Sequence, residues 1–157
     1  MTNMPRSSVT KRTLAAGDII DAYDPGVTTG YCRLQYLGGR DYVVVASREI
    51  LWENRHADVR EISTYMPDHV VVESFRLYSG AAKHMINDTF PACEMIGIIT
   101  HAMWIISGPT VLAQQAAEIK DKITVLPEHE AQIGRSPHRR DAYCHGRLFI
   151  LVHRLGG

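Results

Sequence analysis

The chain has 157 residues, of which 45% are hydrophobic and 22% are charged, so composition and length predict one ordinary globular domain. Its 17 Lys and Arg balance 17 Asp and Glu, and this zero net charge disfavours a strongly basic nucleic-acid-binding protein. No apolar stretch reaches the roughly 18 residues of a membrane span, because His101 interrupts the best one, residues 95–107, so no membrane association is expected.

The cysteines and the first residues bear on the compartment and the domain boundary. Cys32, Cys93 and Cys144 are odd in number, widely spaced and free of any CxxC pair. A disulfide framework or zinc ribbon is therefore disfavoured, and a reducing compartment such as the cytoplasm is expected. Residues 1–17 contain basic residues and no acidic one, which predicts a flexible tail; a DNA-contacting arm and a transit peptide are alternatives. Residues 18–157 are then the folded domain.

The first half of the chain predicts an antiparallel meander followed by a helix. The first apolar run ends at Asp24-Pro25-Gly26, because proline fixes φ and glycine permits positive φ. The β-branched run that becomes the third strand follows a Gly38-Gly39 turn. Strands are expected over residues 18–24, 31–37 and 42–47, and a helix over residues 53–66, which Pro67 ends.

The second half predicts alternating strands and helices. Three consecutive valines at residues 70–72 are typical of a strand buried on both faces. Residues 74–90 are irregular and predict a long functional loop. Beyond it we expect a buried helix over 91–106, a strand over 110–114, a charged turn or helix over 118–124, a polar linker over 126–137 and a closing helix over 138–153. This order describes a mixed sheet flanked by helices.

Three acidic residues lie at the boundaries of these elements. Asp24 ends the first strand, Glu73 ends the valine strand, and Asp141 lies near the start of the last helix. Three carboxylates that converge repel one another strongly unless a divalent cation lies between them, so the pattern predicts a metal-dependent nuclease. Strand alternation places Asp21 on the face opposite Asp24, so Asp21 is not expected to be a fourth ligand and needs a partner or an exposed position.

This order of elements and acids resembles the ribonuclease H-like fold and, within it, the RuvC family of Holliday-junction resolvases. Residues 24–31, Asp-Pro-Gly-Val-Thr-Thr-Gly-Tyr, are similar to the family's first-strand motif, and residues 72–75, Val-Glu-Ser-Phe, to its second acidic motif. Residues 138–142, His-Arg-Arg-Asp-Ala, resemble its final motif, and residues 116–120 resemble the segment with a basic residue near the active site. The likeness spans residues 18–152. Residues 24–30 also resemble the phosphate loop of the actin and sugar-kinase superfamily. Those enzymes close a cleft between two duplicated domains, and a chain of 157 residues without a second such loop disfavours that interpretation.

The resemblance implies an α/β fold with a mixed five-stranded sheet and an Mg²⁺-dependent endonuclease with two ions per active site, Mn²⁺ being an alternative. Asp24 would bridge both ions, while Glu73 and Asp141 would each hold one. His138, three residues before Asp141 on the same helix face, would complete a metal site or assist proton transfer. His145 also faces that way, but a surface or core histidine is the expectation there.

The resemblance also implies branched DNA, the four-way junction, as the partner, and a role in DNA recombination and repair in a bacterial cell, with the protein encoded by host or phage. A junction presents two symmetric strands, which favours a two-fold homodimer; the apolar face of residues 95–106 would be core or part of the dimer seam. The expected DNA contacts are Phe75, Arg76, Tyr78, Lys120, Lys122, Arg139 and Arg140. The alternative for the aromatic residues is packing in the core, and the alternative for the basic residues is a solvated surface.

Two other functions remain open from sequence. One is a ribonuclease H-like nuclease that acts on RNA or on other DNA structures. The other is a nucleic-acid-binding module of the same fold without catalytic activity, which the presence of all three acids, Asp24, Glu73 and Asp141, disfavours.

Overall fold

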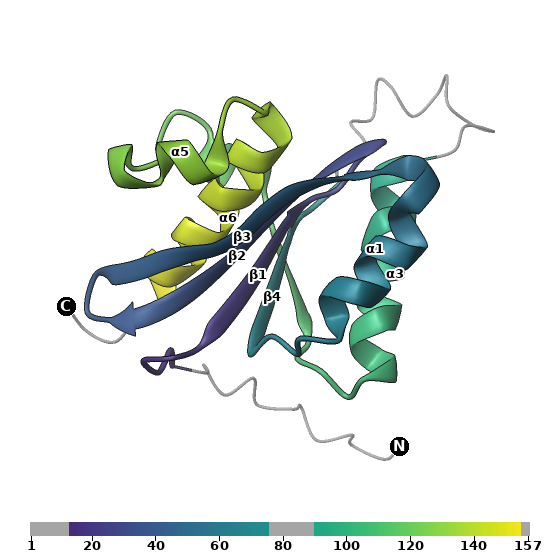
Figure 1. The fold of residues 1–157 in the computed structure, drawn as a ribbon, viewed down its shortest axis with the longest axis horizontal. Coiled ribbons are helices and arrows are strands. Elements are labelled where there is room, and N and C mark those ends of the chain that lie inside the picture. The colour runs from purple at the N-terminus through teal and green to yellow at the C-terminus, as the bar shows by residue number, and fades with distance from the viewer. Residues whose placement is uncertain (1–12, 76–89, 155–157) are drawn as a thin grey trace, which may run out of the picture.

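The fold is built on a mixed five-stranded sheet in the order β3-β2-β1-β4-β5 (Figure 1). The computed structural model describes residues 13–75 and 90–154. Neighbouring strands are antiparallel between β1, β2 and β3, whereas β4 is parallel to both β1 and β5. The strands are β1 Ile19–Asp24, β2 Thr28–Gly38, β3 Asp41–Leu51, β4 His69–Glu73 and β5 Val111–Gln114. The predicted α/β class and the predicted five-stranded mixed sheet are confirmed.

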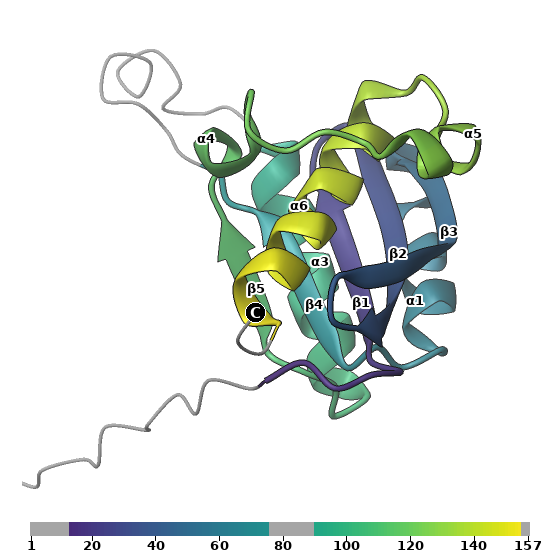
Figure 2. The same cartoon turned by 90° about the vertical axis from the view of Figure 1, so that its left-hand side faces the viewer.

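Helices cover both faces of the sheet (Figures 1 and 2). Two of them, α1 and α3, lie together on one face, and the long α6 crosses the other. The helical segments are η1 Trp52–Asn54, α1 Arg55–Ser63, α3 Pro91–Ile105, α4 Ala116–Ile119, η2 Pro127–His129, α5 Glu130–Ile133 and α6 Pro137–His153. The predicted order of elements is confirmed, but the expected linker over residues 126–137 contains the short η2 and α5.

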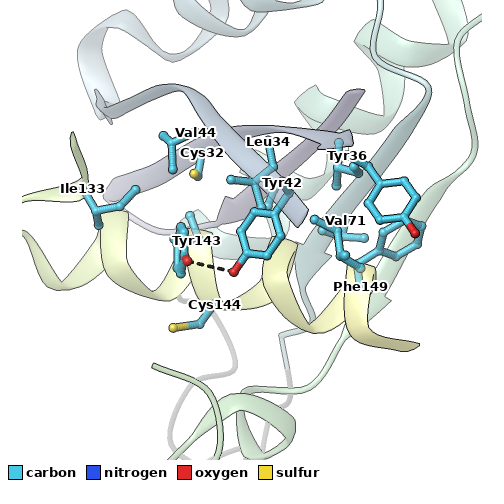
Figure 3. Close-up of a cluster of buried hydrophobic side chains, with 14 of the residues drawn as sticks. Cys32, Leu34, Tyr36, Tyr42, Val44, Val71, Ile133, Tyr143, Cys144 and Phe149 are labelled. Carbon is cyan, nitrogen blue, oxygen red and sulfur yellow. Dashed lines mark hydrogen bonds between the residues drawn. The ribbon is translucent and has the colours of Figure 1, made fainter. Parts of the chain in front are cut away.

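Strand alternation divides the apolar side chains into two cores. In β1, Ala22 packs toward α6 and Tyr23 toward α1 and α3. In β4, Val71 lies in the α6 core, drawn in Figure 3, while Val70 and Val72 lie in the other. The three valines are therefore buried on both faces of the sheet, as their run predicts.

Two glycines allow α6 to lie unusually close to the sheet. An added Cβ on Gly30 of β2 would stand 1.8 Å from the carbonyl oxygen of His138, and one on Gly146 would stand 2.9 Å from a methyl of Leu34. The first contact is with backbone, which cannot rotate away. Because Gly30 pairs with Asp24 across β2 and β1, this approach brings the first turn of α6 beside the end of β1.

Asp21, on the other face of β1, is paired as expected. Its carboxylate is fully buried and accepts hydrogen bonds from Arg33 Nε and Nη2, each at 2.7 Å, and from the Tyr31 hydroxyl at 3.0 Å. Such a bidentate pair satisfies a buried charge that would otherwise be costly. Asp21 therefore belongs to the α1 side of the molecule and not to the edge that Asp24 reaches.

The packed domain begins before the expected boundary at residue 18. Leu14 is buried in the α6 core, and the Gly17 amide donates to the Tyr36 carbonyl at 2.7 Å. Residues 1–12 of the expected tail lie outside the described residues. In the part of the chain that the structure describes, no helix is long and apolar enough to cross a bilayer.

Candidate active site

The topology of the sheet gathers the three acids at one edge. β1 and β4 are neighbouring parallel strands, so their last residues, Asp24 and Glu73, lie at the same end of the sheet. The last helix, α6, begins at that end, which Figure 2 shows, and carries Asp141 in its second turn. Ser136 caps α6 by accepting a hydrogen bond from the Arg139 amide at 3.3 Å, and Pro137 suits its first position.

Asp24 and His138 form the first contact of the site. His138 Nδ1 lies 3.1 Å from Asp24 Oδ2. The Asp24 side chain is only 13% exposed, whereas the His138 side chain is 43% exposed. The pair therefore joins a carboxylate at the end of β1 to an imidazole that remains open to solvent.

Glu73 and His145 form the second contact. His145 is fully buried on α6, and its Nε2 lies 3.0 Å from Glu73 Oε2. Its other ring nitrogen, Nδ1, lies 2.9 Å from Gln114 Oε1. Since Gln114 pairs with Glu73 across β5 and β4, one imidazole connects the ends of two strands to α6.

The charges of the three acids act on one another. Burial, followed by the charges of Glu73 and Asp141, raises the pKa of Asp24 to about 6, against the opposing hydrogen bond from His138. Burial and then the charge of Glu73 also raise the pKa of Asp141, although His145, His138 and Arg140 oppose this. Mutual repulsion of this kind identifies a site that favours a cation or a proton.

The donor set suits a hard divalent cation, but its side chains are turned toward histidines. Among residues 13–75 and 90–154, no group of three His, Cys, Asp or Glu side chains is placed around a common point that could hold a metal ion. Asp24 and Glu73 each have an oxygen hydrogen-bonded to a histidine instead. Carboxylate oxygens are the ligands that Mg²⁺ and Mn²⁺ prefer, so the chemistry fits such an ion once Asp24 turns away from His138, while Glu73 keeps Oε1 available beside its contact with His145.

The predicted phosphate-binding arginines have partners within the protein. Arg139 Nε donates to Ser47 Oγ of β3 at 3.0 Å. Arg140 forms a bidentate pair with Glu130 of α5, at 2.6 and 3.0 Å. The two guanidinium groups therefore hold the 126–137 segment and β3 to the start of α6, and among the described residues neither forms a hydrogen bond or ion pair with Asp24, Glu73 or Asp141.

The other predicted DNA contacts lie around the same edge or outside the described residues. Phe75 is 39% exposed, packs on Phe90 with ring centroids 5.4 Å apart, and lines a cleft of about 270 Å³ that Glu73 also lines. Lys120 and Lys122 are exposed just after α4. Arg76 and Tyr78 fall outside the described residues.

Sequence reasoning underestimated His145 and missed Gln114. The expectation for His145 was a surface or core histidine; it is buried, and it also contacts the Glu73 carboxylate. Its spacing of four residues from Asp141 and seven from His138 places the three on one helix face, which was the available signal. The sequence around Gln114 carried no such signal, because its contact with His145 depends on the pairing of β4 with β5.

Comparison with known proteins bears on the fold. No protein-family model matches the chain, and no curated protein matches it by sequence. Among solved structures, RuvC of Thermus thermophilus in complex with Holliday junction substrate matches with a TM-score of 0.66 and 17% identity, over 88% of this chain and 96% of that one. The fowlpox virus Holliday junction resolvase matches with a TM-score of 0.58 and 17% identity, over 85% of this chain and 99% of that one. The chain therefore has the ribonuclease H-like fold that RuvC and the fowlpox virus resolvase share.

Proposed function

We propose that this protein is a divalent-cation-dependent endonuclease that resolves Holliday junctions or other branched DNA by paired nicking. The observation that carries the proposal is the position of Asp24, Glu73 and Asp141 at one edge of a ribonuclease H-like sheet, with their charges coupled. The two resolvases of the same fold add support, since each has been solved with Holliday junction DNA. Fold alone does not fix function, so the acids carry the argument.

The three carboxylates would hold Mg²⁺ or Mn²⁺, with Asp24 shared between two ions and Glu73 and Asp141 each on one of them. When bound, two such ions would supply activation of the attacking water and stabilisation of the negative charge that develops at the phosphate. Rotation of Asp24 away from His138 Nδ1, now 3.1 Å away, would free that nitrogen, which can serve as a further ligand or a proton acceptor once it has lost the proton that it donates to Asp24. The half-exposed ring of His138 can then exchange that proton with solvent.

Contacts with DNA would surround this edge. Phe75 offers an exposed aromatic face beside Glu73 on which an unpaired base can stack. Lys120 and Lys122 are the exposed cations of the α4 side. To bind phosphate, Arg139 would have to give up its hydrogen bond to Ser47, and Arg140 its ion pair with Glu130. Arg76 and Tyr78 remain sequence-based candidates for the same role.

The proposed assembly is a two-fold dimer, because a junction has two symmetric strands to cut. The α3 helix supports this, since Trp104 and Ile105 are 77% and 63% exposed on it. Light scattering after size exclusion should give twice the chain mass for the wild type and a monomer for Trp104→Arg. A monomeric wild type at micromolar concentration would contradict the assembly.

Cleavage of a synthetic four-way junction with Mg²⁺, beside linear duplex and RNA controls, tests the activity. We expect symmetric nicks in the junction alone, lost in Asp24→Asn, which should still bind the junction. Asp41→Asn is the matched control, because it makes the same charge change on the exposed turn at the far end of the sheet. Cleavage of RNA alone would favour a ribonuclease, and binding without cleavage a non-catalytic module. Full activity of Asp24→Asn would refute the assigned site.

A further inference from the structure

The contacts of His145 with Glu73 and Gln114 join three elements, and the imidazole is fully buried while the Glu73 side chain is 25% exposed. Glu73 ends β4, Gln114 ends β5, and His145 lies on α6 above them. His145 is fully buried, with 3.0 Å from Nε2 to Glu73 Oε2 and 2.9 Å from Nδ1 to Gln114 Oε1. Its neighbour Gly146 lies against Leu34 and Ala22, so the backbone at this point of α6 has no room to shift toward the sheet.

The hydrogen-bond chemistry fixes the direction of this contact. A carboxylate only accepts hydrogen bonds, so His145 Nε2 must carry the proton that it donates to Glu73. The second nitrogen then either donates to the Gln114 oxygen or accepts from the Gln114 amide, and both arrangements orient the same ring. Gln114 therefore keeps the Nε2–H of His145 directed at Glu73.

One oxygen of Glu73 is thereby held and the other is left available. Oε2 accepts from His145, whereas Oε1 accepts no hydrogen bond from the described residues. Without a donor behind it, the Glu73 side chain would be free to turn away from the negative charges of Asp24 and Asp141, which act on the same edge. A buried donor on α6 opposes that rotation.

We propose that His145, braced by Gln114, is a positioning residue that holds the Glu73 carboxylate at the edge of the sheet with Oε1 directed to a divalent cation. This inference rests on the proposed function, since it assumes that Glu73 is a cation ligand. Partners of this kind behind metal ligands typically change affinity or activity 10- to 100-fold when removed. His145 itself touches neither substrate nor cation in this assignment.

The test measures Mn²⁺ binding to the protein alone, by titration calorimetry without DNA. His145→Phe keeps a buried ring but removes both ring nitrogens, and we expect about 10- to 100-fold weaker Mn²⁺ binding. His145→Gln places an amide donor near the position of Nε2 and should recover most of that loss. Tyr143→Phe is the control, because it removes two buried hydrogen bonds, with His129 and with Tyr42, from the same helix, and Tyr143 does not contact Asp24, Glu73 or Asp141.

Junction cleavage adds a second readout. If His145 positions Glu73, His145→Phe lowers kcat while KM for the junction stays near that of the wild type, because DNA contacts are intact. A merely structural role would lower the melting temperature and leave Mn²⁺ affinity unchanged, as Tyr143→Phe should. If His145→Phe does not fold, Gln114→Leu decides: it should weaken Mn²⁺ binding, and unchanged binding would overturn the inference.

The two proposals fail in distinguishable ways. Weak Mn²⁺ binding in Asp24→Asn together with wild-type binding in His145→Phe would overturn the positioning role alone. Wild-type binding in both variants would overturn the proposed cation site. Weak binding in both, with rescue by His145→Gln, is the result that the inference requires.

Discussion

Replacement of Asp24 by asparagine should stabilise the protein at neutral and alkaline pH when no divalent cation is present. Burial and the charges of Glu73 and Asp141 raise the pKa of Asp24 from 3.8 to about 6. Between these values the folded state binds more protons than the unfolded state, so the free energy of unfolding falls as pH rises from about 4 to 6. Asparagine carries no charge and still offers an oxygen to His138.

The size of the effect follows from the pKa difference. A difference of about two between the folded and unfolded pKa corresponds to about 3 kcal/mol once the pH exceeds both values. We therefore expect Asp24→Asn to raise the free energy of unfolding by up to ~3 kcal/mol at pH 8, and by less than ~1 kcal/mol at pH 4, where Asp24 is largely protonated in the folded wild type. The free-energy cost of the buried Asp24 charge therefore arises where the proposed cation would bind.

Urea denaturation of the wild type and the variant at pH 4 and pH 8, with a chelator present, measures this difference. The exposed control Asp41→Asn should change stability by no more than ~0.5 kcal/mol at either pH. Added Mg²⁺ should stabilise the wild type more than Asp24→Asn, because a ligand that binds only the folded state adds stability. An Asp24→Asn protein that is equally or less stable than the wild type at pH 8 would refute the argument that burial and the neighbouring carboxylates raise the pKa of Asp24.

Further predictions concern the packing that positions the site. Gly30→Ala should lower the free energy of unfolding by at least the ~1–3 kcal/mol of an overpacked core, because its Cβ meets the His138 backbone, and should abolish cleavage. Gly97→Ala on α3 is the control: nothing lies within 4 Å of the added Cβ, so this change should raise the free energy of unfolding by ~0.5–1 kcal/mol. Denaturation midpoints check both, and a Gly30→Ala protein of wild-type stability would contradict the observed approach of α6. Arg33→Met should cost about 3–5 kcal/mol by leaving the Asp21 charge buried, and a second change, Asp21→Leu, should restore most of it. Failure of that rescue would argue against the pairing.

The parts of the fold that could be predicted depend on local signals. The three valines of β4 predicted a strand buried on both faces, since such a strand needs no polar alternation. The break at Asp24-Pro25-Gly26 marked the end of β1 through backbone chemistry alone. The sequence did not predict η2 and α5 within the linker over 126–137. These single turns are held by contacts between distant residues, Arg140 with Glu130 and His129 with Tyr143, which leave no local signal.

The sequence predicted those residues of the candidate site that end a strand. Asp24 and Glu73 come directly after apolar runs, so parallel pairing of β1 and β4 brings them together once the topology is known. His145 has the same helical spacing as a core residue, and only coordinates show that its ring reaches Glu73. Arg139 and Arg140 were interpreted from their position beside Asp141, but a one-dimensional pattern does not show that other side chains already bind them.

Anomalous diffraction from crystals soaked in Mn²⁺ tests the cation site most directly. The account predicts manganese peaks at the edge of the sheet where β1 and β4 end, coordinated by oxygens of Asp24, Glu73 and Asp141, with Asp24 turned away from His138 Nδ1. A map without a peak at this edge, in which Asp24 and Glu73 still bind only His138 and His145, would contradict it.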